Sequence, residues 1–201
     1  MGSKFDVVLA RRKISYPLVD YIALRGVLDV AVRLAPLFTP RMPGTGAAFS
    51  VKCTNFGSLG WCSDKARGYH YSATHPLTET PWPPIPERLL ELWCEYVPSC
   101  EPECCLVNHY ARGSKLGMHV DSDEDAFDVP VISVSLGASA KFRLGGWRRS
   151  DPSQVFDLND GDVLVLGGES RRWFHGVDSV AGPRISLTLR RVTLPASKDR
   201  E

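Results

Sequence analysis

Hydrophobic positions recur with a helical period in parts of the first half of the chain. Residues 18–38 carry apolar side chains at mixed three- and four-residue spacings, which predicts a helix. A second amphipathic helix is predicted from about Pro86, because proline is tolerated in the first turn of a helix. Between these helices, residues 49–61 predict a strand and a turn, and residues 68–72 predict a short aromatic strand.

The pattern changes after Cys100, where short β-rich runs follow one another. Turn-forming residues separate these runs, as in the segment LNDGD at 158–162. Such a succession predicts a β-sandwich or jelly roll. We therefore expect one α+β domain, in which an N-terminal α/β half packs on an all-β half. The eight predicted strands lie within 105–111, 115–121, 131–137, 140–144, 154–158, 162–168, 172–177 and 184–192.

Composition and charge narrow the classes of function. Of the 201 residues, 43% are hydrophobic and 23% are charged, which is ordinary for a globular protein and excludes a disordered chain. The 24 basic and 23 acidic residues give a net charge of +1, which excludes a binder that works by bulk positive charge but not a local basic groove. No apolar run reaches the ~20 residues of a membrane span. The N-terminal segment also lacks the apolar core of a signal peptide, so we expect a soluble, cytoplasmic protein with no membrane partner.

The six cysteines do not predict a disulfide framework or a zinc site. No C-x-x-C pair is present, and Cys104 and Cys105 are adjacent, which is poor geometry for either arrangement. We interpret all six as reduced thiols.

Three residues of the second half have the chemistry of a metal site. His119 and Asp121 are two positions apart on a predicted strand, so their side chains point to the same face. His175 in another predicted strand would complete two imidazoles and one carboxylate, the facial triad of non-haem Fe(II) oxygenases. An H-x-D pair also occurs by chance, and a surface histidine near an acidic run remains the alternative.

The last predicted strand places two arginines on one face. Arg184 and Arg190 share that face with Ser186, whereas the intervening positions are aliphatic. Guanidinium groups bind carboxylates through paired hydrogen bonds, so this face is suited to a dicarboxylate. A solvated edge strand that carries arginines against aggregation is the alternative. Asn108 and Tyr110 similarly alternate on one face of their strand.

Four motifs of this half together closely resemble the bacterial AlkB proteins. They are N-x-Y at 108–110, H-x-D at 119–121, GGESR-x-x-x-H at 167–175 and R-x-S-L-T-L-R at 184–190. The resemblance runs from about Phe49 to Arg191. Members of this family are Fe(II)- and 2-oxoglutarate-dependent dioxygenases that oxidatively demethylate nucleic acid bases.

The resemblance implies an organisation for the single domain 1–201. Residues 101–195 would form a double-stranded β-helix, the jelly-roll catalytic core. Residues 49–100 would form a β-rich nucleotide-recognition lid with a supporting helix, and residues 1–48 would form N-terminal helices that support the fold.

The resemblance also implies the cofactors and the residues that bind them. Fe(II) would be held by His119, Asp121 and His175, and dioxygen would bind at the iron. The 2-oxoglutarate co-substrate would be contacted by Asn108, Tyr110, Arg184, Ser186 and Arg190. Two positions depart from the bacterial pattern: Ser186 stands where that pattern has Asn, and Leu166 stands where it has Trp.

Five residues are implied to bind the substrate: Trp61, Tyr69, Tyr71, Asp123 and Arg149. The aromatic residues would hold a flipped base, and stacking contributes roughly 1–3 kcal/mol per base. A carboxylate at Asp123 would favour a methylated base because methylation makes the base cationic. Arg171 and Arg172 are candidate phosphate contacts. The alternative interpretation of these positions is ordinary core aromatics, a solvated acidic turn and solvent-facing arginines.

We therefore expect a monomeric enzyme that demethylates N1-methyladenine and N3-methylcytosine and thereby repairs alkylation damage. Its products would be succinate, carbon dioxide, formaldehyde and the unmodified base. Its partner would be alkylated single- or double-stranded DNA, or RNA, since a 2′-OH contact leaves no sequence motif. Two alternatives remain: a tRNA-modifying or protein-demethylating enzyme of the same chemistry, and a non-catalytic nucleic-acid-binding jelly roll.

Overall fold

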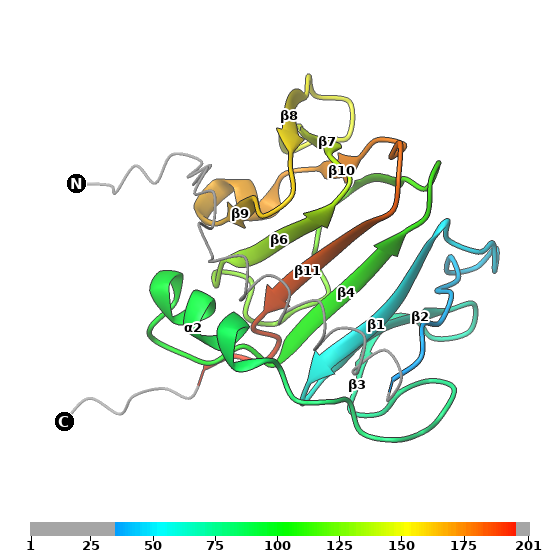
Figure 1. Cartoon of the computed structure of the whole chain (residues 1–201), viewed down its shortest axis with the longest axis vertical. Coiled ribbons are helices and arrows are strands. Elements are labelled where there is room, and N and C mark those ends of the chain that lie inside the picture. The colour runs from blue at the N-terminus through cyan, green and yellow to red at the C-terminus, as the bar shows by residue number, and fades with distance from the viewer. Residues whose placement is uncertain (1–34, 196–201) are drawn as a thin grey trace.

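The computed structural model describes residues 35–195, which form three antiparallel sheets and one α-helix (Figure 1). The helix is α2 (Glu87–Tyr96), and a 3₁₀ helix, η1, spans Gly168–Arg172. The five-stranded sheet has the order β1-β4-β11-β6-β9, the four-stranded sheet β5-β10-β7-β8, and β2 and β3 form a hairpin. The strands are β1 (Val51–Gly57), β2 (Gly60–Asp64), β3 (Gly68–Ser72), β4 (Cys104–Tyr110), β5 (Leu116–His119), β6 (Val131–Gly137), β7 (Ala140–Leu144), β8 (Gln154–Leu158), β9 (Val163–Leu166), β10 (His175–Val177) and β11 (Arg184–Arg190).

Strand β11 lies at the centre of the five-stranded sheet, between β4 and β6 (Figure 1). Arg184 pairs with Tyr110, and Ser186 pairs with Asn108. Because side chains at paired positions lie on the same face, the period-two patterns of the two strands combine into one polar row. This register therefore brings four of the predicted cofactor-binding side chains to one face of the sheet.

Two hydrophobic clusters cover the two faces of this sheet. The inner cluster lies between the large sheets and includes Leu106 from β4 and Phe142 from β7. The outer cluster joins Leu187 and Leu189 to Leu92 and Trp93 of α2. The helix thus closes one face of the sheet, while the other face is left to form a site between the two sheets. This arrangement confirms the predicted jelly roll.

The strand predictions were accurate at several positions and wrong at others. β3, β6, β7 and β8 have the predicted bounds. β5, however, ends at His119, so Asp121 follows the strand instead of belonging to it. β1 pairs with β4 in the five-stranded sheet, although it falls in the segment expected to form the lid. Sheet membership depends on long-range pairing, which the local pattern does not specify.

The predicted helix over residues 18–38 lies mostly outside the described residues. Its last four residues are not helical, and Phe38 instead forms an antiparallel bridge with Cys53. The six cysteines are free, as predicted, and burial raises the pKa of Cys62 to about 11 and that of Cys104 to about 12. Within residues 35–195, no helix is long and apolar enough to cross a bilayer.

Candidate metal centre and active site

The three predicted metal ligands come together at one end of the space between the sheets. His119 ends β5, His175 begins β10, and the two residues are paired across these strands. A Cβ atom at Gly176 would lie 2.8 Å from the backbone oxygen of Leu116, so a glycine beside His175 lets β10 approach β5 closely. Asp121 lies just beyond β5, and one ligand atom from each of the three side chains lies within 4.8 Å of the others.

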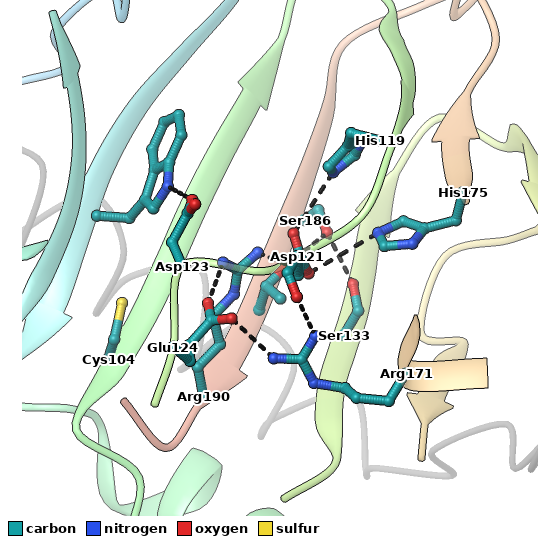
Figure 2. A network of polar contacts seen from close by, with 12 residues as sticks. Cys104, His119, Asp121, Asp123, Glu124, Ser133, Arg171, His175, Ser186 and Arg190 are labelled. Atoms are coloured by element: carbon teal, nitrogen blue, oxygen red, sulfur yellow. Dashed lines mark hydrogen bonds and ion pairs between the residues drawn. The ribbon is translucent and has the colours of Figure 1, made fainter. Parts of the chain in front are cut away.

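Backbone carbonyls orient both imidazoles for metal binding. The Nδ1 atom of His119 lies 2.8 Å from the carbonyl oxygen of Gly117, and that of His175 lies 3.1 Å from the carbonyl oxygen of Trp173. A carbonyl only accepts hydrogen bonds, so each Nδ1 carries a proton and Nε2 is the ring atom that can bind a metal. Burial lowers the pKa of His175 to about 4, which keeps that ring neutral. The two Nε2 atoms lie 3.5 and 3.8 Å from the carboxylate oxygens of Asp121 (Figure 2).

Asp121 is held as a carboxylate by its neighbours. Burial alone raises the pKa of Asp121, but Arg190 and the two histidines hold that pKa well below its usual range. Arg190, at the end of β11, donates from Nη2 to the Oδ2 atom of Asp121 at 2.9 Å. The donor set is thus two imidazoles and one ionised carboxylate, which is the set that non-haem Fe(II) prefers.

Arg184 supplies the second part of the site, a buried cation with spare donors. Its guanidinium donates from Nη2 to the hydroxyl of Ser135 at 2.9 Å and lies over the ring of Tyr110. Among the described residues, its Nε and Nη1 atoms have no hydrogen-bond partner, although the side chain is only 2% exposed. Buried donors without partners are costly, so this guanidinium is suited to receive a carboxylate.

A cavity between the sheets connects Arg184 with the metal ligands. Asn108 and Tyr110 line it from β4, and His119, Asp121 and His175 line its other end. The distal carboxylate of 2-oxoglutarate would fit at Arg184 and its 2-oxo acid end would fit at the metal. The residues present therefore fit both cofactors.

The two positions that depart from the bacterial pattern line this same cavity. Ser186 shares hydrogen bonds with Ser133 at 2.9 Å and with Thr188 at 3.4 Å, so its hydroxyl belongs to a chain of hydroxyl groups. Leu166 is buried in the wall of the cavity. Both substitutions thus change the lining of the space that the co-substrate would occupy.

A larger cavity of about 250 Å³ opens on the other side of the metal ligands. Trp61 and Tyr69 of the hairpin line it with stacked rings whose centroids are 5.7 Å apart. The indole of Trp61 donates to the Oδ2 atom of Asp123 at 3.0 Å (Figure 2). Arg149 lines the same cavity and lies over the ring of Phe174. Four of the five predicted substrate residues are therefore brought together.

Tyr71 is the exception, because its hydroxyl is directed to a buried carboxylate. It does not line the larger cavity, and its hydroxyl donates instead to Glu124. Arg171 was a candidate phosphate contact but is only 3% exposed, with its guanidinium bound to Glu124 and to the backbone of Asp121. Arg172 remains on the surface, where it pairs with Asp128. The period-two pattern of strands could not predict where these three side chains point, because the acidic residues that bind them lie in loops.

Glu124 is the residue that sequence reasoning missed. It belongs to the acidic run after Asp121, yet its side chain is fully buried and paired with Arg171 and Arg190. Burial raises the pKa of Glu124, but the nearby arginines bring it below its ordinary value. In the sequence, nothing separates this carboxylate from its exposed neighbours Asp123 and Asp125.

Comparisons with known proteins agree with this geometry. Residues 23–190 match the 2OG-Fe(II) oxygenase superfamily. The chain is 43% identical over 187 residues to an alpha-ketoglutarate-dependent dioxygenase AlkB homolog of Caulobacter vibrioides, covering 87% of this chain and 84% of that protein. It is 40% identical over 172 residues to the alpha-ketoglutarate-dependent dioxygenase AlkB of Escherichia coli, covering 83% and 78% of the two chains. The chain belongs to the AlkB family.

A solved structure extends this result to the fold. The structure of OsALKBH1 matches with a TM-score of 0.74 and 25% sequence identity, and the match covers 90% of this chain and 94% of that one. As an AlkB-family protein, the chain is an alpha-ketoglutarate-dependent dioxygenase that uses Fe(II), 2-oxoglutarate and dioxygen. These findings disfavour the non-catalytic alternative.

Proposed function

We propose that this AlkB-family enzyme oxidatively removes N-methyl groups from nucleic acid bases and thereby repairs alkylation damage. The observation that carries the proposal is the junction of two cavities at one cluster of metal ligands, His119, Asp121 and His175. One cavity contains a buried arginine suited to a dicarboxylate, and the other contains stacked aromatic rings suited to a base. The relatives' names, which include nucleic acid dioxygenases and DNA demethylases, support the same substrate class.

His119, Asp121 and His175 would hold Fe(II), which supplies the oxidation of the methyl group when bound with 2-oxoglutarate and dioxygen. Their contribution is geometry: both imidazoles present Nε2 because backbone carbonyls hold Nδ1. Three protein ligands leave the remaining positions of the metal to the co-substrates. Arg190 keeps Asp121 ionised and in place.

Arg184 would clamp the distal carboxylate of 2-oxoglutarate with its two unpartnered donors. Asn108 and Tyr110 would contact the co-substrate from the adjacent strand, and Ser186 would contribute its hydroxyl. Holding the co-substrate at both ends fixes which of its atoms meet the metal. The protein thereby orients the reaction and the cofactor performs it.

Trp61 and Tyr69 would hold the flipped base, and Asp123 would select for its charge. Methylation at N1 of adenine or N3 of cytosine produces a cationic base, which a nearby carboxylate favours over the neutral parent. Burial raises the pKa of Asp123 above its usual value, and its bond from Trp61 opposes that rise. Arg149, exposed at the same cavity, would meet the phosphate backbone.

We further infer a division of labour within the single domain. Residues 49–100 would act as the nucleotide-recognition lid and its supporting helix, and residues 101–195 as the catalytic core. The substrate would be alkylated DNA, in single- or double-stranded form, or RNA. A monomeric state and a cytoplasmic location remain predictions.

The decisive experiment is demethylation of a defined oligonucleotide. The full chain is loaded anaerobically with Fe(II), then given air, 2-oxoglutarate and a single strand that contains N1-methyladenine. Mass spectrometry should show loss of the methyl group, with His119→Ala inactive and the matched variant His109→Ala active. Succinate without demethylation would show that the dioxygenase is active and would rule out this substrate. An RNA strand tested in parallel decides between the two nucleic acids.

The role of Asp123 has its own test. Asp123→Asn removes the charge and keeps the size, so the preference for cationic methyladenine over a neutral methylated base should fall several-fold while Mn(II) still binds. The measurement is the ratio of kcat/KM for the two bases. Loss of metal binding would show that Asp123 supports the metal centre instead of selecting the base.

A further inference from the structure

Two neighbouring carboxylates in the loop after Asp121 bind the hairpin β2–β3. Trp61 and Tyr71 face each other across the hairpin as a pair in register. The indole N–H of Trp61 donates to Asp123, and the hydroxyl of Tyr71 donates to Glu124. Consecutive residues of the loop after Asp121 thus each bind one half of the same cross-strand pair. Only the first of these bonds belongs to the proposed base-binding cavity.

Glu124, unlike the neighbouring carboxylates, is buried and forms two ion pairs. Its Oε1 atom accepts from Arg190 at 2.8 Å, and its Oε2 atom accepts from Arg171 at 2.7 Å. The side chain is fully buried, whereas Asp123 and Asp125 are exposed. A buried carboxylate with both oxygens occupied has one orientation, so its partners are held with it.

Both arginines that Glu124 holds also touch Asp121. Arg190 donates to the carboxylate of Asp121 at 2.9 Å, and Arg171 donates to the backbone oxygen of Asp121 at 2.5 Å (Figure 2). Arg190 also donates to the hydroxyl of Tyr71 at 3.1 Å. The side chain and the backbone of one metal ligand are therefore fixed from two directions by cations that share a single carboxylate.

We propose that Glu124 is a positioning residue that holds Asp121 in its metal-binding orientation through Arg190 and Arg171, and that Tyr71 ties this hold to the β2–β3 hairpin. Asp121 needs such support because it lies beyond the end of β5, where no strand pairing fixes it. Two cations and two carboxylates balance within this buried network. Movement of the hairpin then changes the metal centre through a hydroxyl group that does not line the proposed base-binding cavity. This inference rests on the proposed metal-binding role of Asp121.

The test measures Mn(II) affinity of the full chain, with no nucleic acid and no turnover. Glu124→Gln keeps the shape of the side chain and removes its charge, and loss of a group that orients a ligand weakens metal binding about 10- to 100-fold. The dissociation constant, from titration of free Mn(II) by electron paramagnetic resonance, should rise at least tenfold. Asp125→Asn, the exposed carboxylate next in the chain, is the matched control and should leave it unchanged.

A double variant separates positioning from simple charge balance. Glu124→Gln alone leaves an excess buried cation and lowers stability, whereas Glu124→Gln with Arg171→Gln restores the balance. We expect the double variant to regain thermal stability and still to bind Mn(II) weakly. Recovery of wild-type affinity would overturn the positioning role. If the single variant does not fold, the double variant carries the same comparison.

The tie to the hairpin is tested with tyrosines. Tyr71→Phe removes only the hydroxyl and should raise the Mn(II) dissociation constant roughly threefold, because Glu124 loses one of its hydrogen bonds. Tyr96→Phe, on α2, should have no effect. Equal constants for the two variants would overturn the tie. If the wild-type chain does not bind Mn(II), the metal site itself is overturned. If the wild-type chain and the variants bind Mn(II) equally tightly, only the positioning role is overturned.

Discussion

Strand β11 presents Leu187 and Leu189 to one side and Arg184, Ser186 and Arg190 to the other, and all five side chains are buried. On the outer side, α2 covers the leucines with apolar side chains. On the inner side, the Nε and Nη1 atoms of Arg184 and the Nε atom of Arg190 have no hydrogen-bond partner among the described residues. The two faces are both buried but have different roles: one stabilises the fold, and the other is kept polar for a ligand.

The difference also explains why one strand can serve both purposes. Alternation along a strand separates the two faces completely, so the outer face is free to pack tightly while the inner face meets chemical demands. The polar face lowers the stability of the folded state, because a buried cation without a full set of partners is unfavourable. Substitutions on the two faces should therefore affect different measurements.

The largest effect is expected on the outer face. Leu187→Ala should lower the free energy of unfolding by about 3 kcal/mol, because it removes buried contacts and leaves a cavity against α2. The KM for 2-oxoglutarate should not change. Chemical denaturation and steady-state kinetics measure the two quantities, with the exposed Leu194→Ala as the control. A large change in that KM would show that the two faces are not independent.

The inner face should respond in the opposite way. Arg184→Met keeps much of the side-chain volume but loses the carboxylate partner, so the KM for 2-oxoglutarate should rise roughly 30-fold, equivalent to about 2 kcal/mol. The free energy of unfolding should stay the same or increase, since a poorly partnered buried cation is gone. Arg143→Met, on β7 and paired with Asp178, is the control and should leave the KM unchanged. A stability loss as large as that of Leu187→Ala would make Arg184 a structural residue.

The smallest effect is expected from the hydroxyl chain. Ser186→Ala breaks the bond with Ser133 and should raise the KM for 2-oxoglutarate roughly fivefold, as for the loss of about one hydrogen bond of 1 kcal/mol. Ser139→Ala, exposed beyond the end of β6, should have no effect. An unchanged KM in both variants would show that this position no longer contacts the co-substrate, in keeping with its departure from the bacterial pattern.

Prediction from sequence succeeded where a local period decides the outcome. The alternation in residues 184–190 correctly separated the two faces of β11, and the bounds of β6 and β7 followed from the apolar runs and their turns. It failed at Asp121, which the same alternation placed on a strand. There the chain leaves β5 at His119, and hydrogen bonds from distant arginines hold the residue instead.

The sequence by itself determined the class of β-sandwich or jelly roll, the residue types of the metal site and the two-sided character of β11. These properties are encoded in side-chain period and motif spacing, which short segments carry independently of the rest of the chain. Only the tertiary structure decided which acidic residue after Asp121 is buried and which arginines it binds. Glu124, Arg171, Arg190 and Tyr71 come from four separate segments, and the energy of a buried charge depends on the partners that folding brings to it.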